Sequence, residues 1–335
     1  MVSILTIKLV LEQNYCNFAQ PSHKLFMKGP LYYSKILLFG EYGIIKDSKG
    51  LSIPYNFYNG ALKKDENPSE EAIKSNKSLK LFTTYIQNID NTIVRFDNKQ
   101  LQEDVDSGMY FDSSIPQGYG VGSSGALVAA LYDKYAFNKI TVLENLTREK
   151  LLKLKSIFSA MESFFHGKSS GLDPLNSYLS IPILINSKDN IEATGIPAQQ
   201  IEGKGAVFLL DSGIIGETAP MVSLFMESMK QEGFRKMLKN QFIKRTDACV
   251  DDFLKGDIKS LFKNTKQLSK VVLNHFKPMI PQQFHALWKK GIETNEYYLK
   301  LCGSGGGGYI LGFTEDIDKA KQSLSDYKLE VVYNF

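Results

Sequence analysis

Residues 116–130 read PQGYGVGSSGALVAA, a glycine-rich turn that leads into an apolar run with helical spacing. Glycines let backbone N–H groups approach an anion closely, and the amino end of the predicted helix directs its dipole at the same place. Ser123 or Ser124 is the expected N-cap of that helix. The pattern predicts a phosphate-binding loop. For the turn taken alone, a glycine-rich turn without a ligand is the alternative.

Two better-known nucleotide-binding patterns do not fit this turn. A Walker A loop is excluded because no G-K-[ST] follows the glycines. A dinucleotide-binding fingerprint is excluded because the required strand, helix and acidic residue are not in register. The turn therefore points to a different class of phosphate site.

Residues 162–174, ESFFHGKSSGLDP, place Glu162 and Asp173 on either side of a predicted helix end. Apolar residues at helical spacing over 143–165 predict a long amphipathic helix with Glu162 near its carboxyl end. Pro174 disfavours the α region for Asp173, which is therefore expected on an irregular loop or at a helix start. Two such carboxylates can face one cavity, one holding a metal ion and the other taking a proton. The alternatives are a solvated helix face for Glu162 and a turn residue for Asp173.

Residues 301–313, LCGSGGGGYILGF, carry consecutive glycines before a β-prone segment. Ordering such a run costs conformational entropy, so it calls for close packing of the backbone against a ligand or another loop. A flexible linker is the alternative, and the apolar flanks argue against it.

The rest of the chain shows coarser patterns. The apolar segment 31–45 is broken at Gly40 and followed by a turn at 47–50, which predicts a strand pair. A polar loop over 63–78 enters a helix at about Glu70. We expect a mixed strand region over 92–112, a strand and then a loop over 204–222, and mostly helix over 221–300. The polar, turn-rich segment 182–200 is the expected domain boundary.

The composition is that of a globular protein, with 43% hydrophobic residues in a chain of 335 that is long enough for two domains. A formal net charge of +4 spread along the chain is too small to indicate a nucleic-acid partner. The spacing of the three cysteines and four histidines supports neither a disulfide framework nor a zinc site. No apolar run approaches the ~20 residues that span a bilayer, and no cleavage site follows the apolar segment 2–11. We therefore expect a cytoplasmic protein without a membrane partner.

Residues 1–26 contain none of these motifs, and Met27 opens the segment that runs into the first strand region. We interpret 1–26 as an N-terminal extension, with Met27 as an alternative start. Removal of the extension is expected to leave folding and activity intact.

Taken together, the motifs resemble those of the GHMP kinase family. SKILLFGEYGII (34–45) is similar to the first family motif, IPQGYGVGSSGALVAA (115–130) to the second and CGSGGGGYILGF (302–313) to the third, in the family's order. The resemblance implies a two-lobed α+β fold, with an N-terminal ATP-binding lobe over 27–190, a C-terminal lobe over 191–335 and the active site between them. It also implies ATP and Mg²⁺ as cofactors and a small-molecule substrate, and it is compatible with a homodimer.

The resemblance also implies roles for individual residues. Asp173 would be the catalytic base that takes the proton of the substrate hydroxyl, with Lys35 keeping it ionised and stabilising the transferring charge. Ser124 and Glu162 would ligate Mg²⁺. The implied ATP-phosphate site comprises Pro116, Gly118, Gly120, Gly122, Ser123, Ser124 and Gly125. The implied substrate site comprises Glu41, Tyr42, His166, Ser170, Gly171, Ser304 and Gly305.

The segment from Glu162 to Asp173 fits E-x-x-x-H-G-x-x-S-G-x-D and resembles the version in mevalonate kinases, which implies phosphorylation of mevalonate in isoprenoid biosynthesis. Gly40-Glu41-Tyr42 stands where mevalonate kinases commonly carry G-E-H, a form also seen in phosphomevalonate kinases. The acidic residue usual in the glycine run of phosphomevalonate kinases is missing. The galactokinase signature G-E-H-T-D is absent, and homoserine kinases lack the S-G-x-D arrangement. Phosphomevalonate kinase and a non-catalytic ATP- or metabolite-binding relative remain the alternatives.

Overall fold

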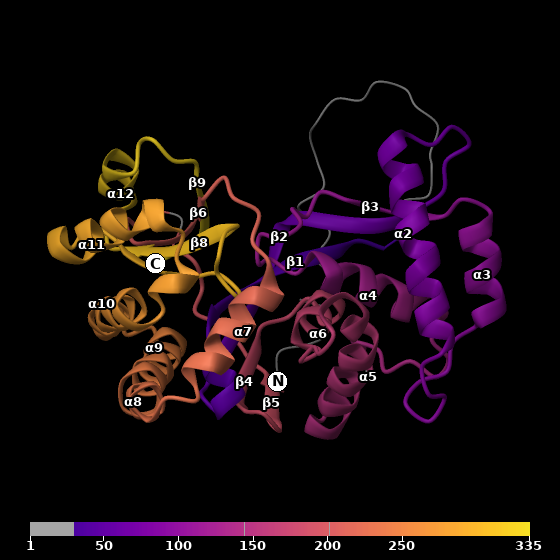
Figure 1. The fold of residues 1–335 in the computed structure, drawn as a ribbon, viewed down its shortest axis with the longest axis horizontal. Coiled ribbons are helices and arrows are strands. Elements are labelled where there is room, and N and C mark those ends of the chain that lie inside the picture. Colours follow the sequence, from indigo (N-terminus) through magenta and orange to yellow (C-terminus); the bar gives the residue numbers. More distant parts are fainter. Residues whose placement is uncertain (1–29, 144, 201) are drawn as a thin grey trace, which may run out of the picture.

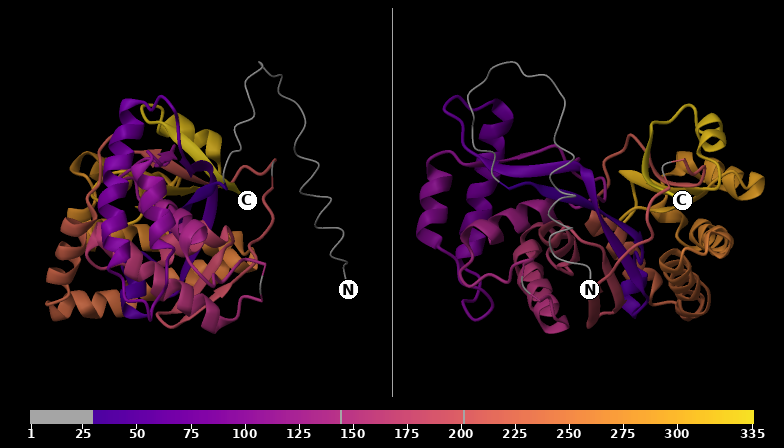
Figure 2. Two further views of the ribbon diagram at one scale, coloured as in Figure 1. Left: turned by 90° about the vertical axis from the view of Figure 1, so that its right-hand side faces the viewer. Right: turned by 180° about the vertical axis from the view of Figure 1, so that it is seen from behind.

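The computed structural model describes residues 30–143, 145–200 and 202–335. The predicted extension over 1–26 lies outside these residues. Two lobes lie side by side, each built from an antiparallel sheet with helices packed against it (Figure 1). The view from behind shows the same division (Figure 2). The fold is therefore α+β and two-lobed, as the motifs predict.

The first lobe contains a five-stranded sheet in the order β1-β2-β4-β5, with β3 paired to β2. The long strand β2 joins the sheet together, because its amino-terminal part pairs with β4 and its carboxyl-terminal part with β3. The strands are β1 (Tyr32–Phe39), β2 (Gly50–Lys63), β3 (Tyr110–Ser113), β4 (Ile183–Ser187) and β5 (Asn190–Ala193).

The helices of the first lobe position most of the predicted site. Helices α4 and α6 pack against each other and against β1, and α5 packs on both. Tyr132 of α4 and Phe158 of α5 are fully buried in this core, with ring centroids 5.0 Å apart. The helices are α2 (Glu70–Gln87), α3 (Asn98–Asp106), α4 (Ser123–Tyr135), α5 (Arg148–His166) and α6 (Leu172–Leu179).

The second lobe contains a four-stranded antiparallel sheet in the order β7-β8-β6-β9. The strands are β6 (Ala206–Asp211), β7 (Tyr298–Leu301), β8 (Tyr309–Thr314) and β9 (Leu329–Asn334). Its α-helices are α7 (Thr218–Ser228), α8 (Glu232–Met237), α9 (Lys244–Lys255), α10 (Ile258–His275), α11 (His285–Thr294) and α12 (Ile317–Ser323). The shorter helical segments of the chain are η1 (Gly43–Lys46), η2 (Leu238–Ile243), η3 (Lys277–Met279) and η4 (Gln282–Phe284).

One hydrophobic core runs from the first lobe into the second. Phe39 at the end of β1 stacks on Phe313 of β8, with ring centroids 5.2 Å apart. Ala126 and Ala129 of α4 belong to the same buried cluster as Leu209 of β6. The end of β1 and the start of α4 are therefore held against the second sheet, which fixes the first and second motifs relative to the third.

Several predicted elements are confirmed at their expected places. Helix α2 begins at Glu70, where the Ser69 hydroxyl caps it by accepting a hydrogen bond from the Ala72 N–H at 3.2 Å. The long helix expected over 143–165 is α5, which starts later than expected, at Arg148, because the Thr147 side chain caps it there. YILGF forms most of β8. The segment 221–300 is mostly helical, as expected. None of the helices in the described ranges is long and apolar enough to span a membrane. The division of the two domains at residue 190 stays a prediction.

Two local predictions were wrong. The expected strand region over 92–112 is mainly helix α3, because the Asp97 carboxylate caps it by accepting from the Gln100 N–H at 3.0 Å while Leu101 and Val105 bury one face. Neither serine caps α4, since the N-cap is Gly122. The Ser124 hydroxyl bonds to another helix instead.

The structure also decides between the two positions expected for Asp173, an irregular loop and a helix start. Asp173 lies in the first turn of α6, so the helix-start alternative holds and the irregular-loop alternative does not. Pro174 follows it inside the helix. A proline is tolerated there because the first-turn N–H groups have no intrahelical acceptor.

Candidate active site

The glycine-rich turn enters α4 through residues with left-handed backbone angles. Gly118, Gly120 and Gly122 have φ values of 76°, 77° and 84°, a region that glycine adopts without a steric penalty. The Lys35 N–H of β1 donates to the Val121 carbonyl at 3.0 Å, which ties the turn to the first strand. The turn therefore sits at the amino end of α4 and beside β1, as a phosphate loop requires.

The glycine run of the third motif packs backbone against backbone on this turn. A Cβ added at Gly120 would lie 2.5 Å from the Cys302 carbonyl oxygen, and one added at Gly308 would lie 2.5 Å from the Tyr119 Cα. The loop before α7 also takes part, since the Gly216 N–H donates to the Gly118 carbonyl at 3.0 Å. The run is thus a packed support for the turn and not a linker.

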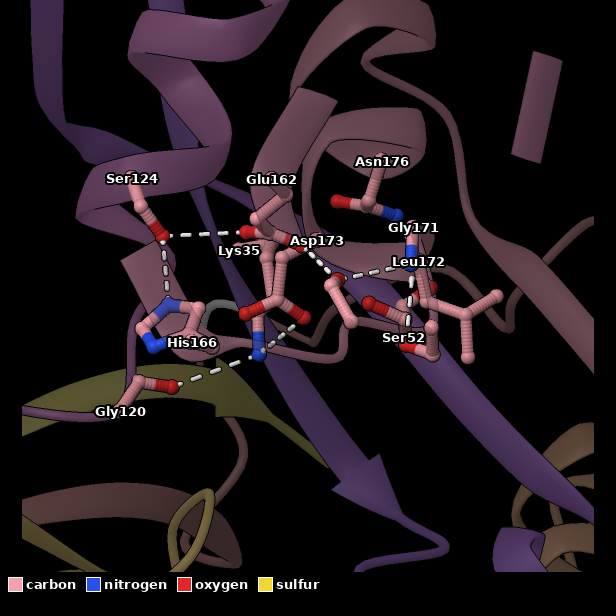
Figure 3. A network of polar contacts seen from close by, with 12 residues as sticks. Lys35, Ser52, Gly120, Ser124, Glu162, His166, Gly171, Leu172, Asp173 and Asn176 are labelled. Atoms are coloured by element: carbon pink, nitrogen blue, oxygen red, sulfur yellow. Dashed lines mark hydrogen bonds and ion pairs between the residues drawn. The ribbon is translucent and has the colours of Figure 1, made fainter. Parts of the chain in front are cut away.

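Lys35 and Asp173 form an ion pair between β1 and α6 (Figure 3). Lys35 Nζ lies 3.0 Å from Asp173 Oδ1 and 3.4 Å from the Gly120 carbonyl oxygen, to which it donates. The Lys35 side chain is only 4% exposed, whereas that of Asp173 is 39% exposed. Burial acts to lower the pKa of Lys35, but the Asp173 carboxylate outweighs it, so that the pKa is raised overall. Lys35 is therefore a buried, charged partner of Asp173, whose carboxylate is accessible to solvent.

Glu162 and Ser124 form the second half of the site (Figure 3). The Ser124 hydroxyl donates to Glu162 Oε1 at 3.0 Å, and His166 Nε2 lies 3.1 Å from the same hydroxyl oxygen. Because the single hydroxyl hydrogen goes to Glu162, His166 Nε2 is the donor in the second contact. The Ser169 hydroxyl donates to the other Glu162 oxygen. Both oxygens of Glu162 are therefore held in place.

Burial and the neighbouring charges shift the titration of this half of the site. Burial raises the pKa of Glu162 from its ordinary 4.5 to about 7, and the negative charge of Asp173 adds to the effect. Burial lowers the pKa of His166, against an opposing effect of Asp173. A neutral imidazole thus lies beside two carboxylates whose mutual repulsion favours a nearby cation.

The donor set fits Mg²⁺. Ser124 and Glu162 offer oxygen ligands, which this hard cation prefers, and a dication would relieve the repulsion between Glu162 and Asp173. The described part of the chain has no group of three or more His, Cys, Asp or Glu that could hold a metal ion. Mg²⁺ at this site would therefore depend on further oxygen ligands, such as ATP phosphates and water.

Residues of the first and third motifs meet at the junction of the lobes. The Tyr42 hydroxyl donates to the Ser304 carbonyl at 2.6 Å. Glu41 is 7% exposed, and its carboxylate accepts a hydrogen bond from Lys300 Nζ at 2.6 Å. Burial raises the pKa of Glu41, and Lys300 opposes that shift. Gly305 packs close to the Met279 carbonyl.

The remaining predicted residues have mainly local contacts. The Ser170 hydroxyl accepts from the Leu172 N–H at 3.3 Å. Gly171 is the N-cap of α6, and a Cβ there would lie 2.1 Å from the Lys155 carbonyl oxygen. Pro116 is half-buried, and Ser123 is the first residue of α4. Gly125 packs against the backbone of Asp173, which brings the starts of α4 and α6 together.

Two polar residues of this region were missed by the sequence reasoning. Ser169 holds Glu162, and its position between the helix end and Gly171 gave little indication of that contact. Lys300 pairs with Glu41, and here a signal existed: a charged residue stands inside the otherwise apolar strand segment YLKL, directly before the third motif.

Comparison with known proteins gives a family match and a set of similar folds. Residues 88–180 match the model of the GHMP kinases N terminal domain. Comparison by sequence with curated proteins finds no match.

Three of the similar solved structures represent different substrates. L. major mevalonate kinase in complex with R-mevalonate has a TM-score of 0.60 at 17% identity, covering 91% of this chain and 95% of that one. Lactococcus lactis galactokinase with galactose has a TM-score of 0.61 at 12% identity, covering 91% and 92%. Streptococcus pneumoniae phosphomevalonate kinase with phosphomevalonate and AMPPNP has a TM-score of 0.56 at 12% identity, covering 90% and 99%.

At these identities the likeness to the solved structures shows the fold alone. The family match covers the second motif and the segment that holds Glu162 and Asp173. Residues 88–180 therefore match the N-terminal domain of the GHMP kinases, whose members are small-molecule kinases, and the fold of the chain is similar to that of solved mevalonate kinases.

Proposed function

We propose that this protein transfers the γ-phosphoryl group of ATP to the hydroxyl of mevalonate and so forms 5-phosphomevalonate. The observation that carries the proposal is the Lys35–Asp173 pair, 3.0 Å apart, next to the glycine-rich turn. The resemblance of the segment from Glu162 to Asp173 to mevalonate kinases supports the choice of acceptor. The likeness of the fold to L. major mevalonate kinase is compatible with it.

In the proposed reaction Asp173 accepts the proton of the acceptor hydroxyl. Its side chain is the more exposed member of the pair, so an acceptor can reach it, while Lys35 stays buried behind it. Lys35 keeps the carboxylate ionised and places a positive charge where the transferring phosphoryl group develops negative charge. The turn over 116–125 holds the ATP phosphates at the amino end of α4.

The proposed metal ligands are Ser124 and Glu162. Mg²⁺ held by these two residues would neutralise negative charge on the ATP phosphates. For this role Glu162 must be ionised, and its two oxygens are already oriented by Ser124 and Ser169. His166 donates to the Ser124 hydroxyl oxygen and so fixes the direction of its remaining lone pair. The remaining residues of the implied substrate site, apart from Glu41, are proposed to line the acceptor side.

Phosphomevalonate is the second candidate acceptor. The observation that favours it is Tyr42, which stands where mevalonate kinases commonly carry histidine. The acceptor atom would then be a phosphate oxygen, which is already deprotonated at neutral pH, and removal of Asp173 would matter less.

A coupled ADP-release assay with mevalonate, phosphomevalonate, galactose and homoserine tests the proposal. We expect turnover with mevalonate, dependence on added Mg²⁺, and no comparable turnover with the other three acceptors. ATP without acceptor serves as the control for hydrolysis. Turnover with phosphomevalonate in place of mevalonate would move the assignment to the second candidate. A folded protein that binds nucleotide but releases no ADP with any acceptor would overturn both.

A further inference from the structure

A buried ion pair joins the first and third motifs across the two lobes. Lys300 Nζ lies 2.6 Å from Glu41 Oε1, and the two side chains are only 4% and 6% exposed. Lys300 also donates to the Leu301 carbonyl at 2.8 Å, and its ammonium lies 5.9 Å from the ring centroid of Phe39. Charged residues are seldom buried this completely unless they are paired, so the pair indicates a specific requirement.

The backbone around Glu41 is shaped to deliver this contact. Gly40 has a φ of 121°, and a Cβ there would lie 2.8 Å from the Gly50 Cα. Tyr42 has a φ of 58°, which is rare for a residue with a side chain. The turn directs Glu41 toward β7 and the Tyr42 hydroxyl toward the Ser304 carbonyl. Glu41 and Tyr42, which are adjacent in one turn, therefore hold the chain on both sides of Cys302, through Lys300 and Ser304.

The segment around Cys302 supports the glycine-rich turn proposed as the phosphate loop. The Cys302 carbonyl oxygen lies against Gly120, and Gly303 packs against the same residue. A shift of this segment would therefore displace the glycine-rich turn, whose Gly120 carbonyl also accepts from Lys35. The negative charge of Glu41 also adds to the raised pKa of Lys35, after the larger effect of Asp173. A change at Glu41 would therefore affect the Lys35–Asp173 pair in two ways, by moving the glycine-rich turn and by changing the charge near Lys35.

We propose that Glu41 and Lys300 are a positioning pair, which holds the third motif against the phosphate loop, and that Glu41 does not contact the acceptor. The inference rests on the proposed phosphoryl transfer, because its main readout is turnover. It departs from the substrate-contact role implied for Glu41 by the resemblance. The reason is that the Glu41 carboxylate is buried and bonded to Lys300, whereas Asp173 is open.

The experiment is a double-mutant cycle with Glu41→Gln, Lys300→Met and the combined variant. Steady-state kcat, the acceptor KM, the Kd of Mg²⁺·AMPPNP and thermal melting are measured for each variant below its melting temperature. Tyr42→Phe provides a milder test, since it removes only the hydroxyl bond to Ser304 and leaves no buried charge unpaired. Lys49→Met is the matched control, because Lys49 also pairs with a carboxylate, that of Asp251, across the lobes but at a more exposed place.

We expect each single variant to lower kcat about 10- to 100-fold, with the acceptor KM changed by less than about threefold. The combined variant should lose no more than the worse single variant, because the two residues act as one unit and no unpaired charge remains. Tyr42→Phe should show a smaller loss of kcat with the same pattern. Lys49→Met should keep wild-type kinetics.

Three results would overturn the proposal. One is a rise of the acceptor KM of tenfold or more in Glu41→Gln alone, which would make Glu41 an acceptor contact. Another is a fold loss of kcat in the combined variant that equals the product of the fold losses in the two single variants. The third is wild-type kcat and nucleotide affinity in all variants. If the wild-type protein turns over no acceptor, the proposed function fails, and the cycle is then judged on the Kd of Mg²⁺·AMPPNP. Each single variant should then bind the nucleotide more weakly. The fold loss of affinity in the combined variant should be smaller than the product of the two single losses.

Discussion

Asp173 stands between two opposing charges. Lys35 lies 3.0 Å from it, while Glu162 is close enough for the two carboxylates to repel each other, which adds to the raised pKa of Glu162. Asp173 is exposed and paired with a buried lysine, and on this geometry we propose it as the acceptor of the hydroxyl proton. We propose Glu162 as a metal ligand because it is buried and both of its oxygens are held by serine hydroxyls.

Replacing Asp173 by asparagine tests its role as the base. We expect kcat to fall by about 10²–10⁴, the range for loss of a general base, with little change in nucleotide affinity. Asp318→Asn, an exposed substitution on α12, is the control for loss of one carboxylate elsewhere. Melting curves are needed, because the substitution leaves Lys35 without its anionic partner. Near-normal turnover would remove Asp173 from the mechanism and favour phosphomevalonate as acceptor.

The raised pKa of Glu162 predicts a pH dependence of stability in the ligand-free protein. Between its ordinary pKa of 4.5 and its folded pKa of about 7, Glu162 holds its proton more tightly in the folded state. Its contribution to stability is therefore present at low pH and is lost as the pH rises through this window. His166, whose pKa is lowered, contributes in the opposite direction. The difference between wild type and Glu162→Gln isolates the Glu162 part.

The measurement is the urea midpoint of both proteins at pH 5, 6, 7 and 8 without Mg²⁺ or nucleotide. Glu162→Gln should gain stability relative to wild type as the pH rises, because the amide never ionises. A constant difference between the two proteins across this range would contradict the raised pKa.

At the scale of the elements, the glycine loops act through close backbone contact. Gly120 has a left-handed φ and lies against the Cys302 carbonyl, whereas Gly256, the C-cap of α9, has a similar φ of 69° and nothing within 4 Å of an added Cβ. Substitutions at the two glycines therefore separate the free-energy cost of a left-handed backbone angle from that of a steric clash with the Cys302 carbonyl.

Gly256→Ala should lower the free energy of unfolding by about 1–2 kcal/mol, the cost of a left-handed angle, and leave kcat unchanged. Gly120→Ala should cost more and should also weaken binding of Mg²⁺·AMPPNP, because the added methyl displaces the phosphate loop from the third motif. Denaturant unfolding and nucleotide titration check both. Equal effects of the two substitutions would show that the contact between the loops has no role in nucleotide binding.

The elements also show what the sequence can and cannot predict. The three glycine- and charge-bearing segments were found because their residue types are unusual for plain structure, and the structure brings them to one junction. The N-cap of α4 was mispredicted because the partner of Ser124 is Glu162, a residue 38 positions away that no local rule identifies. The pair of Glu41 and Lys300 spans 259 positions and depends on how the two lobes meet. Helix α3 was missed because its cap and its buried face outweigh weak strand propensities.

At the scale of the molecule, the two lobes share one core at the place where the motifs meet. The stacking of Phe39 on Phe313 is accompanied by polar contacts, in which the hydroxyls of Tyr58 and Tyr309 lie 2.6 Å apart and Tyr58 donates to Glu330 at 3.1 Å. The active-site half from the first lobe and its support from the second are thus held in register.

The most direct test of the central claim is ³¹P NMR of the protein with ATP, Mg²⁺ and mevalonate, run in parallel with Asp173→Asn. We predict that the γ-phosphate resonance of ATP is replaced by ADP and an equal amount of a new phosphomonoester on mevalonate, and that this conversion is slowed at least about 100-fold in Asp173→Asn. Release of inorganic phosphate without a phosphomonoester, or equal conversion by both proteins, would contradict transfer to the mevalonate hydroxyl with Asp173 as base.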